Sequence, residues 1–128
     1  MKNFQNYIDE CIEMCKKANI ELGHIEQFVI NSRAKARWGY CRLIATNSYI
    51  IEISNELLRD DTSEEGLKKV ILHELLHTCK GCLNHGQKWQ TLASKINLRY
   101  GYNITRTDSS VSLGGVGRKS KRIERNQV

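Results

Sequence analysis

The sequence lacks any apolar run near the 18 residues that a membrane-spanning helix requires, so we expect no membrane span. The first 17 residues also lack a signal peptide, because acidic side chains interrupt the apolar stretch that one would need. These absences exclude integral membrane proteins and favour a cytoplasmic location. No internal repeat is visible, and 128 residues with 40% hydrophobic content suffice for one compact domain with a modest core.

Cysteine is present in a number that does not suggest disulfides. An odd count of five needs no pairing inside the cell, where thiols stay reduced. Cys11, Cys15 and Cys41 are interpreted as small buried hydrophobic residues. Cys79 and Cys82 have a C-x-x-C spacing, which makes them candidates for a different role.

Acidic residues are scarce in the second half of the chain. Residues 1–64 contain 8 basic and 10 acidic side chains, a net charge of −2, whereas residues 65–128 contain 12 and 4, a net charge of +8. This balance favours weak, salt-dependent nucleic-acid binding, and the alternative is a solvated tail that maintains solubility. The basic residues concerned are Lys88, Lys95 and Arg99 in a helix, and Arg118, Lys119, Lys121, Arg122 and Arg125 in the tail.

The pattern of residue types predicts one helix, three strands and two further helices, an α+β fold. Helical spacing of apolar residues covers 4–18, where Asn19 closes the first helix. β-Branched and aromatic residues then predict three strands, with a turn at Asn47-Ser48 between the last two. These strands cover 28–33, 36–46 and 49–54 and should form an antiparallel or mixed sheet.

Two more helices follow the strands. The first starts after Thr62 or Ser63 as N-cap, and Gly81 is expected to end it. The second covers 87–100 and stops at Gly101. We expect residues 1–107 to form a single domain and residues 108–128, which are rich in Ser, Gly and basic residues, to form a flexible tail.

The segment ILHELLHTCKGCLNHGQKWQ contains the strongest functional signal. His73 and His77 are four residues apart on the predicted helix, so their imidazoles leave one face and suit a single zinc ion. Glu74 projects from the edge of that face, where it can take a proton from a metal-activated water without binding the metal. The pattern H-E-x-x-H therefore predicts metal-assisted hydrolysis.

His85 completes the three protein ligands that a catalytic zinc ion requires. It lies eight residues after His77, on the far side of a turn that Gly81 permits. The fourth histidine, His24, is placed in an early loop and is expected to be structural or exposed.

A closed structural zinc site is the alternative arrangement. Cys79 and Cys82 have metal-ligand spacing and could join His77 and His85, leaving no open position for catalysis. On a continuing helix, however, these cysteines would point about 200° and 140° away from His77. A second C-x-x-C pair is also missing from the sequence.

The segment HELLHTCKGCLNHGQKW resembles the SprT-like zinc metallopeptidases, in which H-E-x-x-H is followed by a loop and H-G-x-x-aromatic. ARWGYC, residues 36–41, is similar to the strand motif R-W-G-x-C of that family. The resemblance covers roughly residues 4–105 and implies a minimal zincin fold, with a small sheet against the helix that carries two histidines. It also implies His73, His77 and His85 as zinc ligands and Glu74 as general base.

Two departures from the family pattern bear on function. The sequence has no cysteine after Cys82, whereas many members have a C-terminal zinc ribbon with two cysteine pairs, and Gln87 replaces a frequent proline. The family includes the Spartan protease, which degrades proteins crosslinked to DNA. We therefore expect a monomeric zinc metalloendopeptidase that acts on a protein or peptide, with proteins associated with DNA as a further expectation. The alternatives are a non-catalytic zinc-containing module that binds DNA or another protein, and a structural zinc domain.

The residue that stabilises the oxyanion is not indicated by any motif. Tyr100, Tyr102 and Arg37 are candidates by residue type alone.

Overall fold

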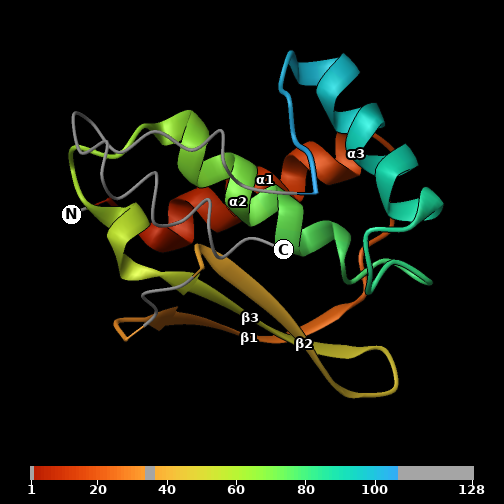
Figure 1. Cartoon of the computed structure of the whole chain (residues 1–128), viewed down its shortest axis with the longest axis horizontal. Coiled ribbons are helices and arrows are strands. Elements are labelled where there is room, and N and C mark those ends of the chain that lie inside the picture. The colour runs from red at the N-terminus through yellow and green to blue at the C-terminus, as the bar shows by residue number, and fades with distance from the viewer. Residues whose placement is uncertain (1, 34–36, 107–128) are drawn as a thin grey trace.

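The computed structural model describes residues 2–33 and 37–106. Its helices lie together on one side of a three-stranded sheet (Figure 1), which is the single α+β domain expected from the sequence. None of the helices in this described part is long and apolar enough to cross a membrane. In chain order, the elements are α1 (Phe4–Lys17), β1 (His24–Asn31), β2 (Gly39–Ala45), β3 (Ser48–Ser54), the short 3-10 helix η1 (Asn55–Leu58), α2 (Glu64–Leu76) and α3 (Gln87–Tyr100).

The sheet is mixed, with the strand order β1-β3-β2. β1 runs parallel to the central strand β3, and β2 forms an antiparallel hairpin with β3. Alternation along β3 buries Tyr49, Ile51 and Ile53 against the helices. β2 is an edge strand, and its first residue, Gly39, lies against α2.

α2 is the most buried element, with ten of its thirteen residues buried. The Ser63 hydroxyl caps it by accepting a hydrogen bond from the Gly66 amide at 2.9 Å, and two glutamates occupy the first turn, where they favour the helix dipole. The remaining sides of α2 face α1, the sheet and α3. His73 and Glu74 are therefore polar residues inside an apolar layer, which is costly unless they have partners.

The C-terminal end of α2 differs from the prediction, because the helix ends at Leu76 instead of near Gly81. The amides of His77, Thr78 and Cys79 bond three residues back, which tightens the chain into a turn. The Thr78 hydroxyl donates to the Leu75 carbonyl at 2.7 Å and so occupies a helix acceptor. Gly81 still has the left-handed conformation expected of it, with φ of 76°, but in the loop that follows.

The strands also differ at their ends. β1 starts at His24, four residues before the prediction, so His24 is a strand residue and not a loop residue; it is exposed as expected. The hairpin turn consists of Thr46 and Asn47, and Ser48 already belongs to β3. Asn47 takes the left-handed conformation, with φ of 53°, that such a turn requires. The predicted flexible tail at 108–128 lies outside the described residues.

Candidate metal centre

Three histidines from two neighbouring segments meet at the C-terminal end of α2. His73 is on the last turn of α2, His77 caps that helix, and His85 lies just before α3. The Nε2 atom of His85 is 2.9 Å from Nε2 of His73 and 3.0 Å from Nε2 of His77. Among residues 2–33 and 37–106, this is the one group of His, Cys, Asp or Glu whose possible ligand atoms lie close enough to hold a metal ion.

The loop between α2 and α3 brings His85 back to the other two imidazoles. The turn after Leu76 reverses the chain, and the Asn84 side chain accepts the Gly86 amide at 3.0 Å to set the entry into α3. The Gln90 side-chain amide then donates to the His85 carbonyl at 2.9 Å. His85 is thus held by the first turn of α3, although it is not part of a helix.

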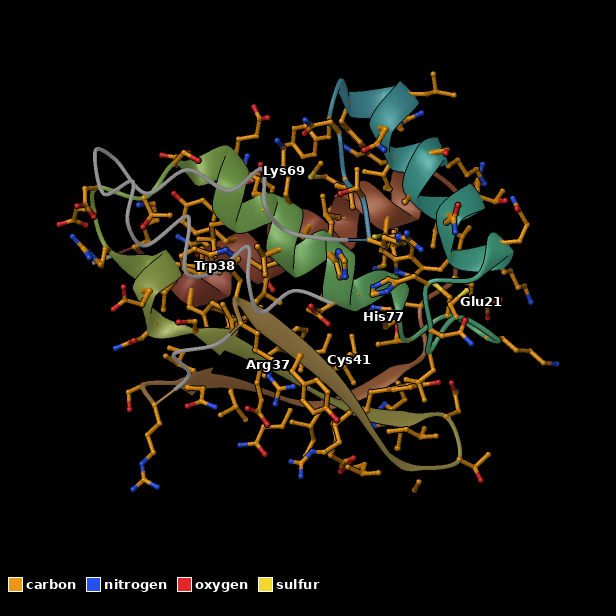
Figure 2. The ribbon with its side chains drawn as sticks, viewed as in Figure 1. Glu21, Arg37, Trp38, Cys41, Lys69 and His77 are labelled. Carbon is orange, nitrogen blue, oxygen red and sulfur yellow. The ribbon has the colours of Figure 1, made fainter. Side chains whose placement is uncertain are left out.

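Hydrogen bonding also fixes the orientation of His77, which Figure 2 shows at the end of α2. Its Nδ1 lies 2.7 Å from the Cys82 carbonyl oxygen, a partner that can only accept. The neutral imidazole therefore carries its proton on Nδ1 and presents the Nε2 lone pair to the histidine cluster.

Trp89 packs against the whole cluster and is only 1% exposed. Its ring centroid lies 4.8 Å from that of His73, 5.5 Å from that of His77 and 4.7 Å from that of His85. The indole Nε1 donates to the His73 carbonyl at 3.4 Å. One apolar side chain thus shields the three imidazoles from water on one side and restricts their rotation.

Burial lowers the pKa of all three imidazoles. For His73 burial is the main cause and the two neighbouring imidazoles add to it, so its pKa falls to about 3 despite an opposing hydrogen bond with the Thr105 backbone. Burial, aided by His77 and Arg106, lowers the pKa of His85 to about 4, and burial lowers the pKa of His77 as well. The three residues are therefore neutral at pH 7, which is the form that binds metal ions.

Glu74 follows His73 on α2 and is 4% exposed. Its side chain faces the start of β2, since a methyl carbon placed on Gly39 would lie 3.0 Å from Glu74 Cγ and 3.1 Å from Oε2. The absence of a side chain at Gly39 is thus what leaves room for the carboxylate. The Glu74 charge also contributes, after burial, to raising the pKa of the Cys41 thiol on β2 to about 12.

Cys79 and Cys82 lie beside the histidine cluster but do not belong to the group that could hold a metal ion in the described residues. Both are buried, and burial raises the pKa of Cys79 to about 12 and raises the pKa of Cys82. The helix does not continue past Leu76, so the turn and not a helical rotation separates these thiols from the imidazoles. Cys11, Cys15 and Cys41 are buried in the core, as expected.

The three residues suggested for oxyanion stabilisation make other contacts. The Tyr100 hydroxyl donates to the Met14 carbonyl of α1 at 2.9 Å, and Tyr102 packs against the core. The guanidinium carbon of Arg37 lies 3.9 Å from the centre of the Tyr40 ring, over which the cation stacks. The cation that acts on the cluster is Arg106, which the sequence did not indicate.

The contacts of Trp89 with the three imidazoles were also not predicted, although this residue lies in the predicted helix at 87–100. Its position four residues after His85 is the signal that could have revealed them, because this spacing lets a side chain in the first turn of a helix reach back to the preceding residue. The contact of Thr105 with His73 had no signal, because it depends on how the chain returns after α3.

The model of the SprT-like family matches residues 2–108 of the chain. No curated protein and no solved structure matches it. The match covers all seven described helices and strands and includes every residue of the histidine cluster. The chain therefore belongs to the SprT-like family.

Proposed function

We propose that this protein is a zinc-dependent metalloendopeptidase in which His73, His77 and His85 hold the zinc ion and Glu74 is the general base. The observation that carries this proposal is the convergence of three neutral imidazoles on one point, two of them buried and that of His85 partly buried, next to a buried carboxylate. Family membership supports the same class of activity, metal-dependent proteolysis.

The donor atoms fit a zinc ion. With Zn–N bonds of about 2.0–2.1 Å, tetrahedral ligands lie about 3.3 Å apart, close to the Nε2 separations of 2.9 and 3.0 Å. Without a cation the contacts are poorly satisfied, because His77 presents a lone pair and a single Nε2 proton on His85 would have to serve two neighbours. A set of three protein ligands also leaves the open fourth position that catalytic zinc sites have.

The protein residues divide the catalytic work. When bound, zinc acts as a Lewis acid that polarises a carbonyl and makes water acidic enough to react near neutral pH. The Glu74 carboxylate accepts the proton of the attacking water and can return it to the leaving amine. Gly39, which has no side chain, leaves room for this carboxylate beside β2, and Trp89 excludes water from one side of the imidazoles.

The test of this proposal combines metal analysis with proteolysis. We expect about one zinc per chain, and loss of zinc and of casein cleavage on His73→Ala, His77→Ala or His85→Ala. His24→Ala is the matched control, because His24 is exposed, lies outside the histidine cluster and pairs with Glu26 at 3.2 Å. Full zinc content in His85→Ala, together with its loss in a Cys79→Ser/Cys82→Ser variant, would establish the structural site instead.

We also propose that the protein contacts nucleic acid weakly through basic residues. Lys88, Lys95 and Arg99 are all exposed on α3, and their spacing of seven and four residues places them on one face of the helix. We call these three residues the α3 basic face. These residues account for three of the twelve basic side chains in residues 65–128, whose net charge of +8 favours contact with phosphate groups.

A further inference from the structure

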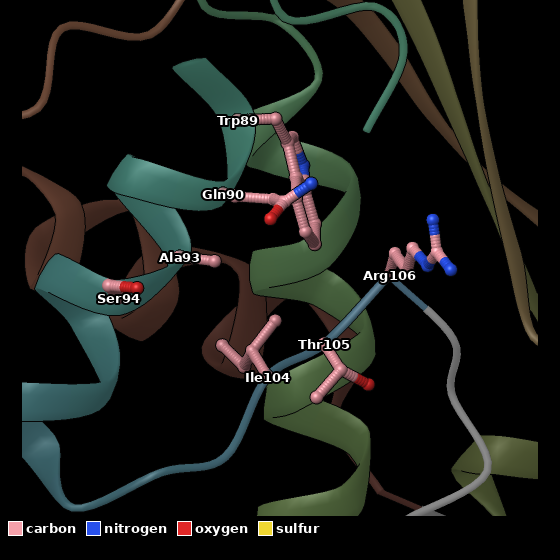
Figure 3. A pocket seen from close by; sticks show the side chains of 7 residues that line it. All are labelled: Trp89, Gln90, Ala93, Ser94, Ile104, Thr105 and Arg106. Atoms are coloured by element: carbon pink, nitrogen blue, oxygen red, sulfur yellow. The ribbon is translucent and has the colours of Figure 1, made fainter. Parts of the chain in front are cut away.

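A groove of about 450 Å³ lies between α3 and the segment that follows it. Figure 3 shows its walls: one from the first two turns of α3 and the other from the chain at 104–106, which passes in front of α2. The volume lies in the range of sites that bind small molecules or side chains. Its lining residues are Trp89, Gln90, Ala93, Ser94, Ile104, Thr105 and Arg106.

This groove adjoins the histidine cluster. Trp89 belongs to both, since its ring lines the groove and packs against all three imidazoles. On the opposite wall, the backbone of Thr105 forms a hydrogen bond with His73, and the positive charge of Arg106 helps to lower the pKa of His85. A substrate group that entered the groove would therefore be held within a residue or two of a peptide bond at the cluster.

The lining has an apolar floor and a polar rim. Trp89, Ala93 and Ile104 are buried, whereas Ser94 and Arg106 are exposed at the edge. The rim contains hydroxyl groups and one cation, and no acidic residue lines the groove. The Arg106 guanidinium points away from α3 in Figure 3, and no carboxylate within 2–33 or 37–106 forms an ion pair with it.

We propose that this groove is a substrate subsite that selects a carboxylate, and that Arg106 binds it. An apolar floor with a cation at the rim suits a ligand with a hydrocarbon stem and an anionic end, and guanidinium is the side chain best shaped for carboxylate. The carboxylate could belong to an acidic side chain near the scissile bond or to the C-terminus of a short peptide. This inference rests on the proposed peptidase function and specifies its substrate class.

The test uses peptides designed around a bond that the protein cleaves in casein. Glu, Gln or Lys is placed at each position beside that bond, and every peptide is made with a free or an amidated C-terminus. We expect cleavage of one Glu peptide to be at least about tenfold faster than that of its Gln counterpart, the effect of one charge-assisted hydrogen bond. Sensitivity to amidation instead of to Glu would identify the chain end as the source of the carboxylate.

Variants connect the preference to Arg106. Arg106→Gln should remove the preference and Arg106→Glu should shift it toward Lys, with zinc content and melting temperature unchanged because Arg106 is exposed. Lys80→Gln is the matched control, since it removes an exposed cation outside the groove. The proposal would be overturned if wild type cleaved the Glu and Gln peptides at equal rates and was also insensitive to amidation of the C-terminus. It would also be overturned if Arg106→Gln kept the wild-type preference.

Failure of the subsite and failure of the peptidase are distinguishable. Cleavage without a carboxylate preference refutes only the subsite. If the zinc-loaded protein cleaves nothing, equilibrium binding of short casein-derived peptides with Glu or Gln at matched positions, each with a free or an amidated C-terminus, to wild type and Arg106→Gln still decides the question. Binding that ignores the carboxylate would then refute the groove proposal together with the enzyme.

Discussion

Gly39 lies against Glu74, so we expect Gly39→Ala to reduce peptidase activity much more than it reduces zinc content. The added methyl carbon would lie 3.0 Å from Val70 Cγ1, 3.0 Å from Glu74 Cγ and 3.1 Å from Glu74 Oε2. Favourable contacts between carbon atoms are about 3.5–4.0 Å long, so the two carbon neighbours must each give way by a few tenths of an ångström, up to about 0.5 Å. The Glu74 carboxylate must move away from β2 to accept the methyl group.

The size of the effect follows from that displacement. A misplacement of about 1 Å in a catalytic group can reduce the rate by about 100-fold, so a shift of about half that distance predicts a 10- to 100-fold loss in kcat. Overpacking should lower the free energy of unfolding by about 1–3 kcal/mol. Zinc content should stay near that of wild type, since the histidines lie on α2 and the loop before α3 and not on β2.

The assay is casein or peptide cleavage at a temperature where all variants are folded, with zinc measured in the same samples. A Gly39→Ala/Val70→Ala variant removes the contact with Val70 and leaves the one with Glu74, so it should remain slow. Wild-type activity in Gly39→Ala would refute this reasoning. Recovery in the double variant would instead attribute the effect to the spacing between β2 and α2.

Three more predictions concern the imidazoles, Trp89 and the α3 basic face. The pKa of His73 is lowered to about 3 and that of His85 to about 4, so below about pH 6.5 the unfolded chain binds more protons than the folded chain. The melting temperature of the metal-free protein should therefore fall between pH 7 and pH 4, and a constant value would contradict this. Trp89→Ala should weaken zinc binding by about tenfold or more in a chelator competition and should lower the free energy of unfolding by about 3–5 kcal/mol. Trp89→Phe should have smaller effects on both. Equal zinc affinity in wild type and both variants would show that Trp89 does not support the metal site. DNA affinity measured by fluorescence anisotropy should fall about tenfold or more between 50 and 200 mM salt and should weaken when the α3 basic face is changed to Gln, and affinity that ignores salt would exclude this contact.

The order of elements was predictable because each has a clear local signal. The Ser63 cap, the helix end at Gly101 and the apolar spacing of α1 depend on neighbours within a few residues, and all three are confirmed. The end of α2 was not predictable in the same way. Gly81 signals a helix stop, but the Thr78 hydroxyl and the packing of the following turn end the helix five residues earlier.

In the candidate site, too, the residues set by local spacing were predictable and the contacts between distant segments were not. Spacing within the sequence was sufficient to nominate His73, His77 and His85, since two share a helix face and the third follows a short turn. Contacts between distant segments were not visible in it. The contact between Glu74 and Gly39 depends on how β2 packs against α2. The position of Arg106 near the histidine cluster depends on the path of the chain after α3.

The most direct measurement of the central claim compares wild type with Glu74→Gln at matched zinc content. Glutamine has nearly the same shape, so it should fit beside Gly39 and leave the fold and the zinc ligands intact. It cannot accept the proton of the attacking water, and general-base catalysis contributes about 10²–10⁴-fold.

We therefore predict that Glu74→Gln binds one zinc per chain, melts near the wild-type temperature and cleaves casein at least about 100-fold more slowly. A competing role for Glu74, as a charge that only stabilises the fold, predicts a lower melting temperature and no change in cleavage. Equal cleavage rates in the two zinc-loaded proteins would contradict the assignment of Glu74 and, with it, the proposal that this histidine cluster is a peptidase active site.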